Sequence, residues 1–192
     1  MKKRILQIGD PDLRLTCNPI TDFEHSDLKM LITNLKDTMY DTGLVGIAAP
    51  QIGQNFQVFI THPRSTTSRI LVKEDNLRIF INPQIQRQSS KQTVMYEGCG
   101  SVAKGELFGP VKRPTEITVT AFDENMQSFT LTCDGLLARV IQHEIDHLEG
   151  IEFLQRITDT SNIIDGTIYR KTIRNSKKQQ ATLRITKLKI QS

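Results

Sequence analysis

Residues 142–150 read QHEIDHLEG, and this stretch decides more about the protein than any other. His143 and His147 are four positions apart, so on a helix their rings share one face, with β-carbons about 5–6 Å apart. Glu144 lies one step round from His143, a pattern typical of metal-binding helices that carry their own base. A bound metal ion lowers the pKa of its water from about 15.7 towards roughly 7, and Glu144 could take the proton. The alternative is a buried helix with two ordinary histidines, which the total of four histidines in the chain disfavours.

The residues around this motif predict the helix itself. Asp134 can cap its start, and Gly150 is placed to end it. Between them runs an apolar stripe with helical spacing, formed by Leu136, Leu137, Val140, Ile141 and Leu148. We therefore expect an α+β fold in which antiparallel or mixed β-sheets pack around a central metal-binding helix with the H-E-x-x-H motif.

Further elements are readable from periodicity. A helix is predicted over 26–40, with Leu28, Leu31, Ile32, Leu35 and Met39 on one face. Strands are predicted over 56–61, 79–82, 116–122 and 128–133, with a hairpin turn at 123–125. At 192 residues and 38% hydrophobic content, the chain suits one domain. We expect a single catalytic domain over 1–168 and a basic C-terminal tail over 169–192, helix or strand, that is not a separate domain.

A catalytic site of the zinc type usually has three protein ligands and one open position, so a third ligand is needed. Cys99 stands between Gly98 and Gly100, where the backbone can turn tightly and a thiolate can reach an ion. It is the best third ligand, although a free cysteine is often just a small buried hydrophobe. Downstream carboxylates stay open as ligands, although none sits in a ligand pattern: Glu149, Glu152, Asp159 and Asp165.

A third segment, residues 43–53, reads GLVGIAAPQIG and is small, apolar and punctuated by glycine. It lacks the spacing and the lysine of a phosphate-binding loop. Its single amide side chain, Gln51, suits an oxyanion-stabilising role beside a metal site.

These three segments, in this order, resemble the signature motifs of the peptide deformylase family: G-x-G-x-A-A-x-Q, E-G-C-x-S and Q-H-E-x-D-H-L-x-G. The resemblance covers residues 5 to about 157. Two positions depart from the pattern. Leu44 stands where the first glycine falls, and Gly100 stands where many members carry a larger residue.

The resemblance implies a metal-dependent hydrolase that removes the N-formyl group from the N-terminal formylmethionine of newly made polypeptides and releases formate. One divalent ion per chain would be held by Cys99, His143 and His147. Fe(II) is the expected ion in the cell, and Zn(II), Ni(II) or Co(II) can substitute in such a borderline-soft site. Glu144 would act as the base, and the developing oxyanion would be stabilised by Gln51 and the backbone N–H of Gly100.

The resemblance also suggests substrate-binding residues, namely Val45, Gly46, Leu136 and Val140, as an apolar pocket for the methionine side chain. Leu136 and Val140 could equally be plain core residues. Glu97 and Arg113 are expected to form an ion pair that supports the cysteine loop, with a solvated arginine as the alternative. Arg139 is expected at the rim of the pocket, in reach of the substrate backbone.

Charge is unevenly placed along the chain. Residues 169–192 hold eight Lys or Arg and no Asp or Glu, within a chain of net charge +4. This tail could contact ribosomal RNA, or it could pack on the body through Ile185, Leu188 and Ile190. Nascent formylmethionyl peptides are the expected substrates, and neither DNA nor a membrane is an expected partner.

Three scattered cysteines argue for a reducing compartment, and the N-terminus lacks the pattern of a signal peptide, so a cytoplasmic location is expected. Two rival classes remain at this point. One is a metallopeptidase of the H-E-x-x-H type, which Phe153 disfavours because one large class has a histidine there. The other is an inactive ribosome- or RNA-binding relative, which the complete set of motif residues disfavours.

Overall fold

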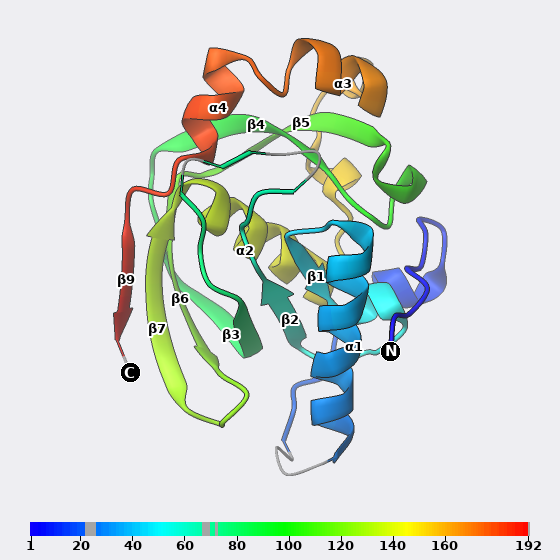
Figure 1. Cartoon of the computed structure of the whole chain (residues 1–192), viewed down its shortest axis with the longest axis vertical. Helices are drawn as coiled ribbons and strands as arrows, with labels where there is room; N and C mark the ends of the chain where they lie inside the picture. Colours follow the sequence, from blue (N-terminus) through cyan, green and yellow to red (C-terminus); the bar gives the residue numbers. More distant parts are fainter. Residues whose placement is uncertain (22–25, 67–69, 72, 192) are drawn as a thin grey trace.

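The computed structural model describes residues 1–21, 26–66, 70–71 and 73–191. Within that part, the strands form two antiparallel sheets (Figure 1). The larger sheet has, in spatial order, β1 (Gly46–Ala48), β2 (Val58–Thr61), β3 (Arg78–Gln88), β6 (Glu116–Phe122), β7 (Ser128–Asp134) and β9 (Leu188–Gln191). The smaller sheet has β4 (Gln92–Gly98), β5 (Leu107–Pro114) and β8 (Ile164–Asp165). The predicted α+β class is therefore confirmed, with antiparallel pairing between all described strands.

Four α-helices accompany these sheets in the described residues: α1 (Ser26–Thr42), α2 (Gly135–Leu148), α3 (Gly166–Thr172) and α4 (Lys177–Leu183). Short 3-10 turns complete the chain: η1 (Pro11–Arg14), η2 (Ala49–Ile52), η3 (Ala103–Gly105), η4 (Phe153–Arg156) and η5 (Thr160–Asn162). No helix of the described residues has the length and apolarity that crossing a membrane requires.

Helix α2 is the central element and carries the His143–Glu144–His147 sequence. It packs on β1, β2, β6 and β7 of the larger sheet and on α4. The predicted apolar stripe is buried in one core cluster with strand residues such as Phe59, Val119 and Leu131. Polar side chains on this helix are also buried, because the smaller sheet covers its other side.

Helix α1 covers the opposite face of β1, β2 and β3. Its predicted apolar face, from Leu28 to Met39, is buried against Ile47, Val58 and Ile60. Because side chains alternate across a strand, neighbours such as Phe59 point instead into the α2 cluster. Two cores thus flank β1 and β2, the short strands before and after the turn that contains Gln51.

The start of α2 differs from the prediction. Asp134 holds the N-cap position but makes no side-chain capping bond. Its carboxylate accepts hydrogen bonds from the backbone N–H groups of Thr186 (2.7 Å) and Lys187 (2.8 Å) instead. The predicted cap is therefore wrong, because the C-terminal segment competes for the carboxylate. At the other end, α2 stops at Leu148 and Gly150 adopts φ +72°, as expected of a glycine that ends a helix.

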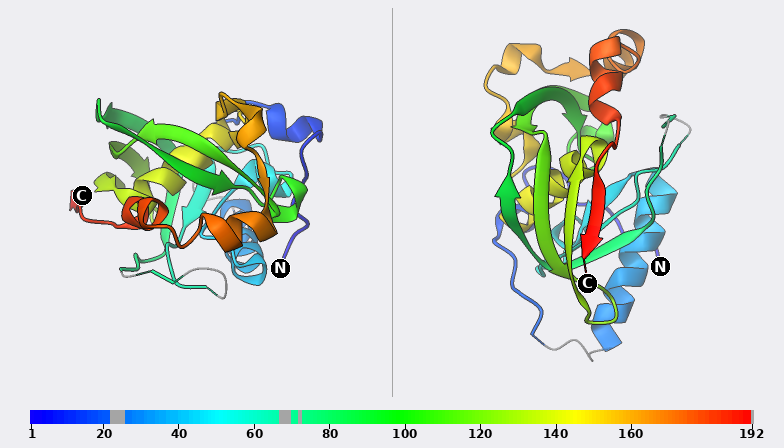
Figure 2. Two further views of the ribbon diagram at one scale, coloured as in Figure 1. Left: turned by 90° about the horizontal axis from the view of Figure 1, so that it is seen from above. Right: turned by 90° about the vertical axis from the view of Figure 1, so that its left-hand side faces the viewer.

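The basic C-terminal segment is folded onto the body of the protein. Leu183 and Ile185 belong to the same core cluster as α2, whereas Ile190 is about half exposed. Strand β9 pairs with β7, and Figure 2 shows it at the edge of the larger sheet, while α3 and α4 cross the smaller sheet.

This packing predicts an unequal response of two glycines to alanine. Gly135 and Gly53 both have positive φ, +61° and +74°, but a β-carbon on Gly135 would lie 2.1 Å from the carbonyl oxygen of Arg184. Gly53→Ala should lower the free energy of unfolding by about 1–2 kcal/mol, the cost of a left-handed residue. Gly135→Ala should cost about 2–5 kcal/mol, because backbone must also move. Equal urea midpoints for the two variants would contradict this packing.

Candidate active site

The structure brings Cys99, His143 and His147 together, although the cysteine lies more than 40 residues from the histidines. One ligand atom from each residue lies within 4.8 Å of the other two. The Cys99 sulfur lies 3.2 Å from Nε2 of His147, and both side chains are buried. One thiolate and two imidazoles form a donor set that suits a borderline-soft divalent ion. The described residues thus fit a metal centre.

Cys99 lies just after β4, in surroundings that favour its thiolate form. The Ser101 N–H and the Gln51 Nε2 donate to its sulfur at 3.4 Å each. Burial opposes ionisation, but the neighbouring charge of His147 and hydrogen bonds from both histidines lower the pKa of the Cys99 thiol well below its usual value. The other two cysteines are buried and free. Burial raises the pKa of the Cys17 thiol to about 11.

Glu144 lies beside these ligands in a narrow space. Burial raises the pKa of its carboxyl group to about 7. Its Oε2 atom is buried and has no hydrogen-bond partner among the described residues. A β-carbon on Gly46 would lie 2.5 Å from Oε1 of Glu144, so only glycine lets β1 come this close. The Glu144 carboxylate is therefore fixed between α2 and β1 with one oxygen available to a water molecule.

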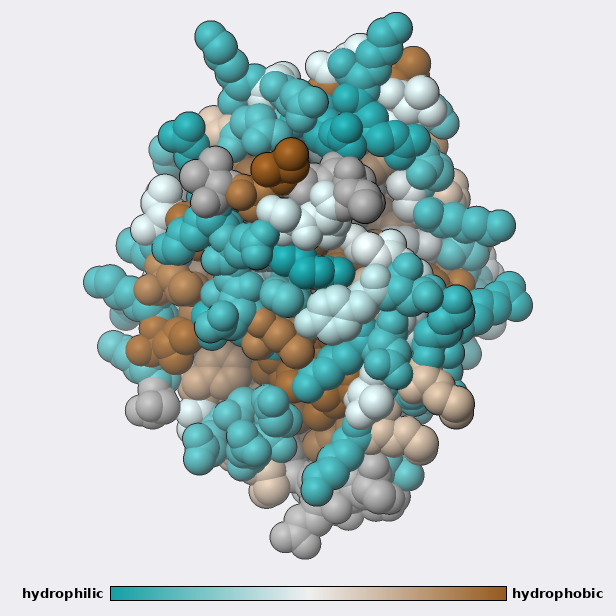
Figure 3. Space-filling view, in the orientation of Figure 1, coloured by the Kyte–Doolittle hydropathy of each residue, from teal (hydrophilic) through white to brown (hydrophobic). Residues whose placement is uncertain are grey.

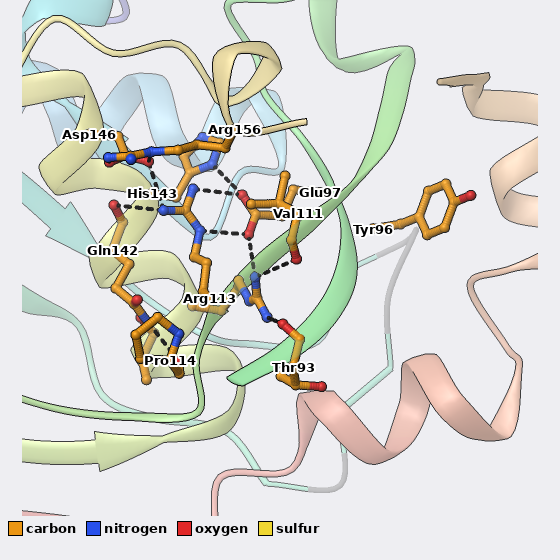
Figure 4. Close-up of polar contacts among 12 residues, drawn as sticks. Thr93, Tyr96, Glu97, Val111, Arg113, Pro114, Gln142, His143, Asp146 and Arg156 are labelled. Atoms are coloured by element: carbon orange, nitrogen blue, oxygen red, sulfur yellow. Dashed lines mark hydrogen bonds and ion pairs between the residues drawn. The ribbon is translucent and has the colours of Figure 1, made fainter. Parts of the chain in front are cut away.

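A buried ion cluster connects α2 to the smaller sheet. Arg113 on β5 donates to both carboxylate oxygens of Glu97, at 2.8 and 3.0 Å, and to Asp146 on α2 at 2.7 Å (Figure 4). All three side chains are about 5% exposed. Burial opposes ionisation of Glu97, but the charge of Arg113 holds the pKa of this carboxyl well below its usual value. The expected pair of Glu97 and Arg113 is thus present as part of a larger cluster.

This cluster also orients a metal-ligand candidate. Glu97 Oε2 lies 3.1 Å from Nδ1 of His143, which leaves the Nε2 side of the ring for an ion. Such carboxylate–histidine contacts fix the tautomer and the ring orientation at metal sites. The ion cluster therefore reaches the ligands through one hydrogen bond.

Arg139 lines the cleft, as expected from the sequence, but its guanidinium is bound within the ion cluster. Its guanidinium is buried, and it donates to Glu97 at 2.9 Å and to the carbonyl oxygens of Val111 (3.0 Å) and Thr93 (2.8 Å). A buried guanidinium needs a carboxylate partner, and Glu97 provides one. Arg139 is therefore a further member of the ion cluster, and both of its terminal nitrogens are bound within the protein.

A cleft of about 280 Å³ opens beside the ligand cluster. All of the residues suggested for substrate binding line it, namely Val45, Gly46, Leu136 and Val140. Gln51, Gly100 and Glu144 also line it. The carboxamide of Gln51 is oriented because its oxygen accepts the N–H of Ala48 at 2.9 Å and its nitrogen donates to Ser101 Oγ at 3.1 Å.

Sequence reasoning missed three residues of this site. Asp146 lies three positions after His143, so its place on the same helical side was readable from the spacing. Arg156 binds the other side of the Asp146 carboxylate, and Ser101 holds Gln51. Ser101 is the last residue of the E-G-C-x-S motif, but the motif does not reveal its contact with Gln51. No sequence pattern marks Arg156, because its partner lies elsewhere in the chain.

A thiolate, two histidines and a buried glutamate at the edge of a cleft, on a helix held between two antiparallel sheets, are the features of a metal-dependent hydrolase. The model of the polypeptide deformylase family matches residues 2–162. The chain therefore belongs to the polypeptide deformylase family, whose members are metalloenzymes that remove the N-formyl group from nascent peptides.

Individual relatives agree with this membership. The chain is 38% identical to a peptide deformylase of Treponema pallidum over 152 residues, which span 79% of this chain and 86% of the relative. It is 35% identical to one of Christiangramia forsetii, with 91% of this chain and 97% of the relative covered. The crystal structure of a Met-Ala-Ser-bound class I type b peptide deformylase from Acinetobacter baumannii superposes with a TM-score of 0.77 at 30% identity. That match covers 82% of this chain and 99% of the other.

The ion cluster predicts that the two arginines bound to Asp146 contribute differently to stability. Arg113→Ala leaves the buried carboxylates of Glu97 and Asp146 without their shared partner and should lower the free energy of unfolding by about 3–5 kcal/mol. Arg156→Ala should cost less than about 1 kcal/mol, because its side chain is 43% exposed and Asp146 keeps Arg113. Denaturant unfolding of the two variants measures the difference. A smaller loss for Arg113→Ala than for Arg156→Ala would contradict the account.

Proposed function

We propose that this protein acts in the cytoplasm on the N-terminal formylmethionine of nascent chains, with Cys99, His143 and His147 holding one divalent ion and Glu144 serving as the base. The observation that carries the proposal is the meeting of the three candidate ligands in one cluster, with Cys99, His143 and Glu144 lining the cleft. Deformylation by this family requires a metal site. The described residues contain one group of potential metal ligands, Cys99, His143 and His147.

We propose Fe(II) as the ion in the cell because of the family resemblance, with Zn(II), Ni(II) or Co(II) able to substitute. The thiolate and imidazole donors suit all four ions and disfavour Mg(II) or Ca(II). When bound, the ion polarises the formyl carbonyl and makes water more acidic. The remaining chemistry belongs to the side chains of the protein.

Glu144 takes a proton from the attacking water as the water oxygen bonds to the formyl carbon. The same carboxyl group then gives that proton to the amine as the bond between carbon and nitrogen breaks. Formate and a free N-terminal methionine result. The pKa of Glu144, raised by burial, suits both halves of this exchange near neutral pH.

Two donors face the charge that develops on the formyl oxygen. The side-chain amide of Gln51 is oriented by Ala48 and Ser101, and its second N–H group is directed to the Cys99 sulfur at 3.4 Å, the side of the site where the formyl oxygen would lie. The second donor is the backbone N–H of Gly100, which follows Cys99 at the cleft. Because this donor is main chain, the unusual glycine keeps the role. A β-carbon here would lie 3.0 Å from the Leu44 side chain, so the two departures from the family pattern are neighbours in space.

The methionine side chain has an apolar place in the cleft. Val45, Leu136 and Val140 line it, with Met95 on the opposing strand. Val140 is one helical turn before Glu144 and faces the same cleft. The formyl group and the side chain would thus be held by adjacent turns of α2.

The metallopeptidase alternative is not favoured by the comparisons. Phe153, where one class of peptidases has a third histidine, is buried in the same cluster as Cys99, with its ring centroid 6.2 Å from that of His143. The thiolate occupies the ligand side of the site in its place. We also propose that the catalytic unit is residues 1–168, with the C-terminal segment packed on it.

Replacing the base should separate chemistry from metal binding. Glu144→Gln keeps the size of the side chain but cannot accept the proton, so formate release from formyl-Met-Ala-Ser should fall about 10²- to 10⁴-fold. The metal content, measured by mass spectrometry of the purified protein, should stay at the wild-type value. Undiminished formate release would rule out Glu144 as the base.

Metal retention should depend on one cysteine of the three. Cys99→Ser should lose most of the bound ion, because the thiolate ligand is removed. Cys133→Ala is the matched control, because Cys133 is buried outside the site and should keep about one ion per chain. Equal metal content in the two variants would contradict the ligand set.

We further propose that the basic C-terminal segment contacts ribosomal RNA. Lys177 and Lys178 at the start of α4 are exposed, and this end of the molecule is largely hydrophilic in Figure 3. Lys177→Glu with Lys178→Glu should weaken cosedimentation with ribosomes and lower its salt dependence by about two counterions. Lys91→Glu with Lys112→Glu, just before β4 and on β5, is the control. Ribosome binding that is unchanged by either double substitution and by the salt concentration would refute the contact.

A further inference from the structure

Strand β4 has a free edge at the cleft. It is the outer strand of the smaller sheet among the described residues, and Tyr96 and Gly98 both line the cleft. Tyr96 pairs with Pro110, which has no N–H, so the backbone polar groups of Tyr96 point away from β5. Gly98 is two residues further along β4, so its backbone N–H and C=O groups also point away from β5. An extended peptide could add to β4 through these two residues.

At Tyr96 this edge is already occupied by a side chain of the protein. The Tyr96 N–H donates to Oε1 of Gln179 at 3.1 Å, and Nε2 of Gln179 donates to the Tyr96 carbonyl at 3.0 Å. Gln179 is 4% exposed. Its amide thus makes the two hydrogen bonds that a residue of an added strand would make.

The helices α3 and α4, of which α4 carries Gln179, are held against the smaller sheet by several contacts. The Gln179 amide also donates to the Tyr169 hydroxyl at 3.4 Å, and the Tyr169 ring stacks on Phe108 with centroids 3.9 Å apart. Arg170 pairs with Glu106 at 2.7 Å. Figure 2 shows α3 and α4 across the smaller sheet, and both helices lie outside the residues that match the family model.

We propose that Gln179 ends the peptide-binding groove, so that the enzyme makes main-chain contact with only the first three residues of its substrate. The proposal rests on the deformylase function. With formylmethionine beside Cys99, a peptide leaving along β4 runs antiparallel to it. The second residue then faces Gly98, and the fourth would face Tyr96, where Gln179 excludes it.

A series of substrate lengths tests this proposal in the wild-type protein. The substrates are C-terminally amidated peptides, formyl-Met-Ala, formyl-Met-Ala-Ser, formyl-Met-Ala-Ser-Ala and formyl-Met-Ala-Ser-Ala-Ala, assayed by formate release. The value of kcat/KM should rise up to the third residue and then change by less than about twofold. A gain of more than about threefold from the fourth residue would overturn the proposal.

Two adjacent glutamines provide a matched pair of variants. Gln179→Ala should free the Tyr96 edge, so that the fourth residue raises kcat/KM by about 2- to 12-fold, the range of one net hydrogen bond. Gln180→Ala should leave the wild-type plateau, because Gln180 bonds to the Arg174 carbonyl instead of β4. Thermal melting of both variants reports whether α4 stays packed.

The possible outcomes distinguish a failure of the Gln179 proposal from a failure of the proposed deformylase function. A folded Gln179→Ala protein that keeps the plateau would remove Gln179 from the role and overturn the proposal. If that variant fails to fold, the wild-type length series still decides the question. Absence of formate release from every peptide by the metal-loaded wild type would instead refute the proposed function itself.

Discussion

One buried guanidinium holds the site together. Arg113 binds Glu97 on the smaller sheet and Asp146 on the central helix, and so joins the two parts of the fold that carry the cysteine and the histidines. Three charges at about 5% exposure are costly to bury unless each is paired. Here the pairing also sets the position of a ligand, because Glu97 contacts His143. The free-energy cost of burying the ion cluster is therefore spent on residues that also orient His143, a candidate metal ligand.

A second constraint acts from the other sheet. Gly46 lets β1 approach Glu144 so closely that any side chain would collide with the carboxylate. The 3-10 turn after β1 then brings Gln51 within 3.4 Å of the Cys99 sulfur. Glu144, Gln51 and Cys99, the proposed base, oxyanion donor and metal ligand, are thus positioned by backbone proximity between β1, η2 and the end of β4, with α2 as their common support.

Much of this arrangement was predictable from local patterns. The helices over 26–40 and around His143 follow from apolar periodicity, and the candidate ligand set follows from two of the three short motifs. The smaller sheet was not predicted, because β5 contains Pro110 and Pro114, and its partner β8 has two residues. The hydrogen-bond partners of Asp134 and Gln179 could not be predicted from the sequence either. Their contacts lie 52 and 83 residues away in the chain, and no local signal encodes such distances.

The central claim is that one sulfur and two nitrogen atoms from this chain hold a single metal ion, in the place that the ion cluster prepares for them. X-ray absorption spectroscopy of the zinc-loaded protein tests it most directly. The account predicts one sulfur scatterer at about 2.3 Å and two histidine nitrogens at about 2.0–2.1 Å. A first shell of oxygen and nitrogen atoms without sulfur would contradict it.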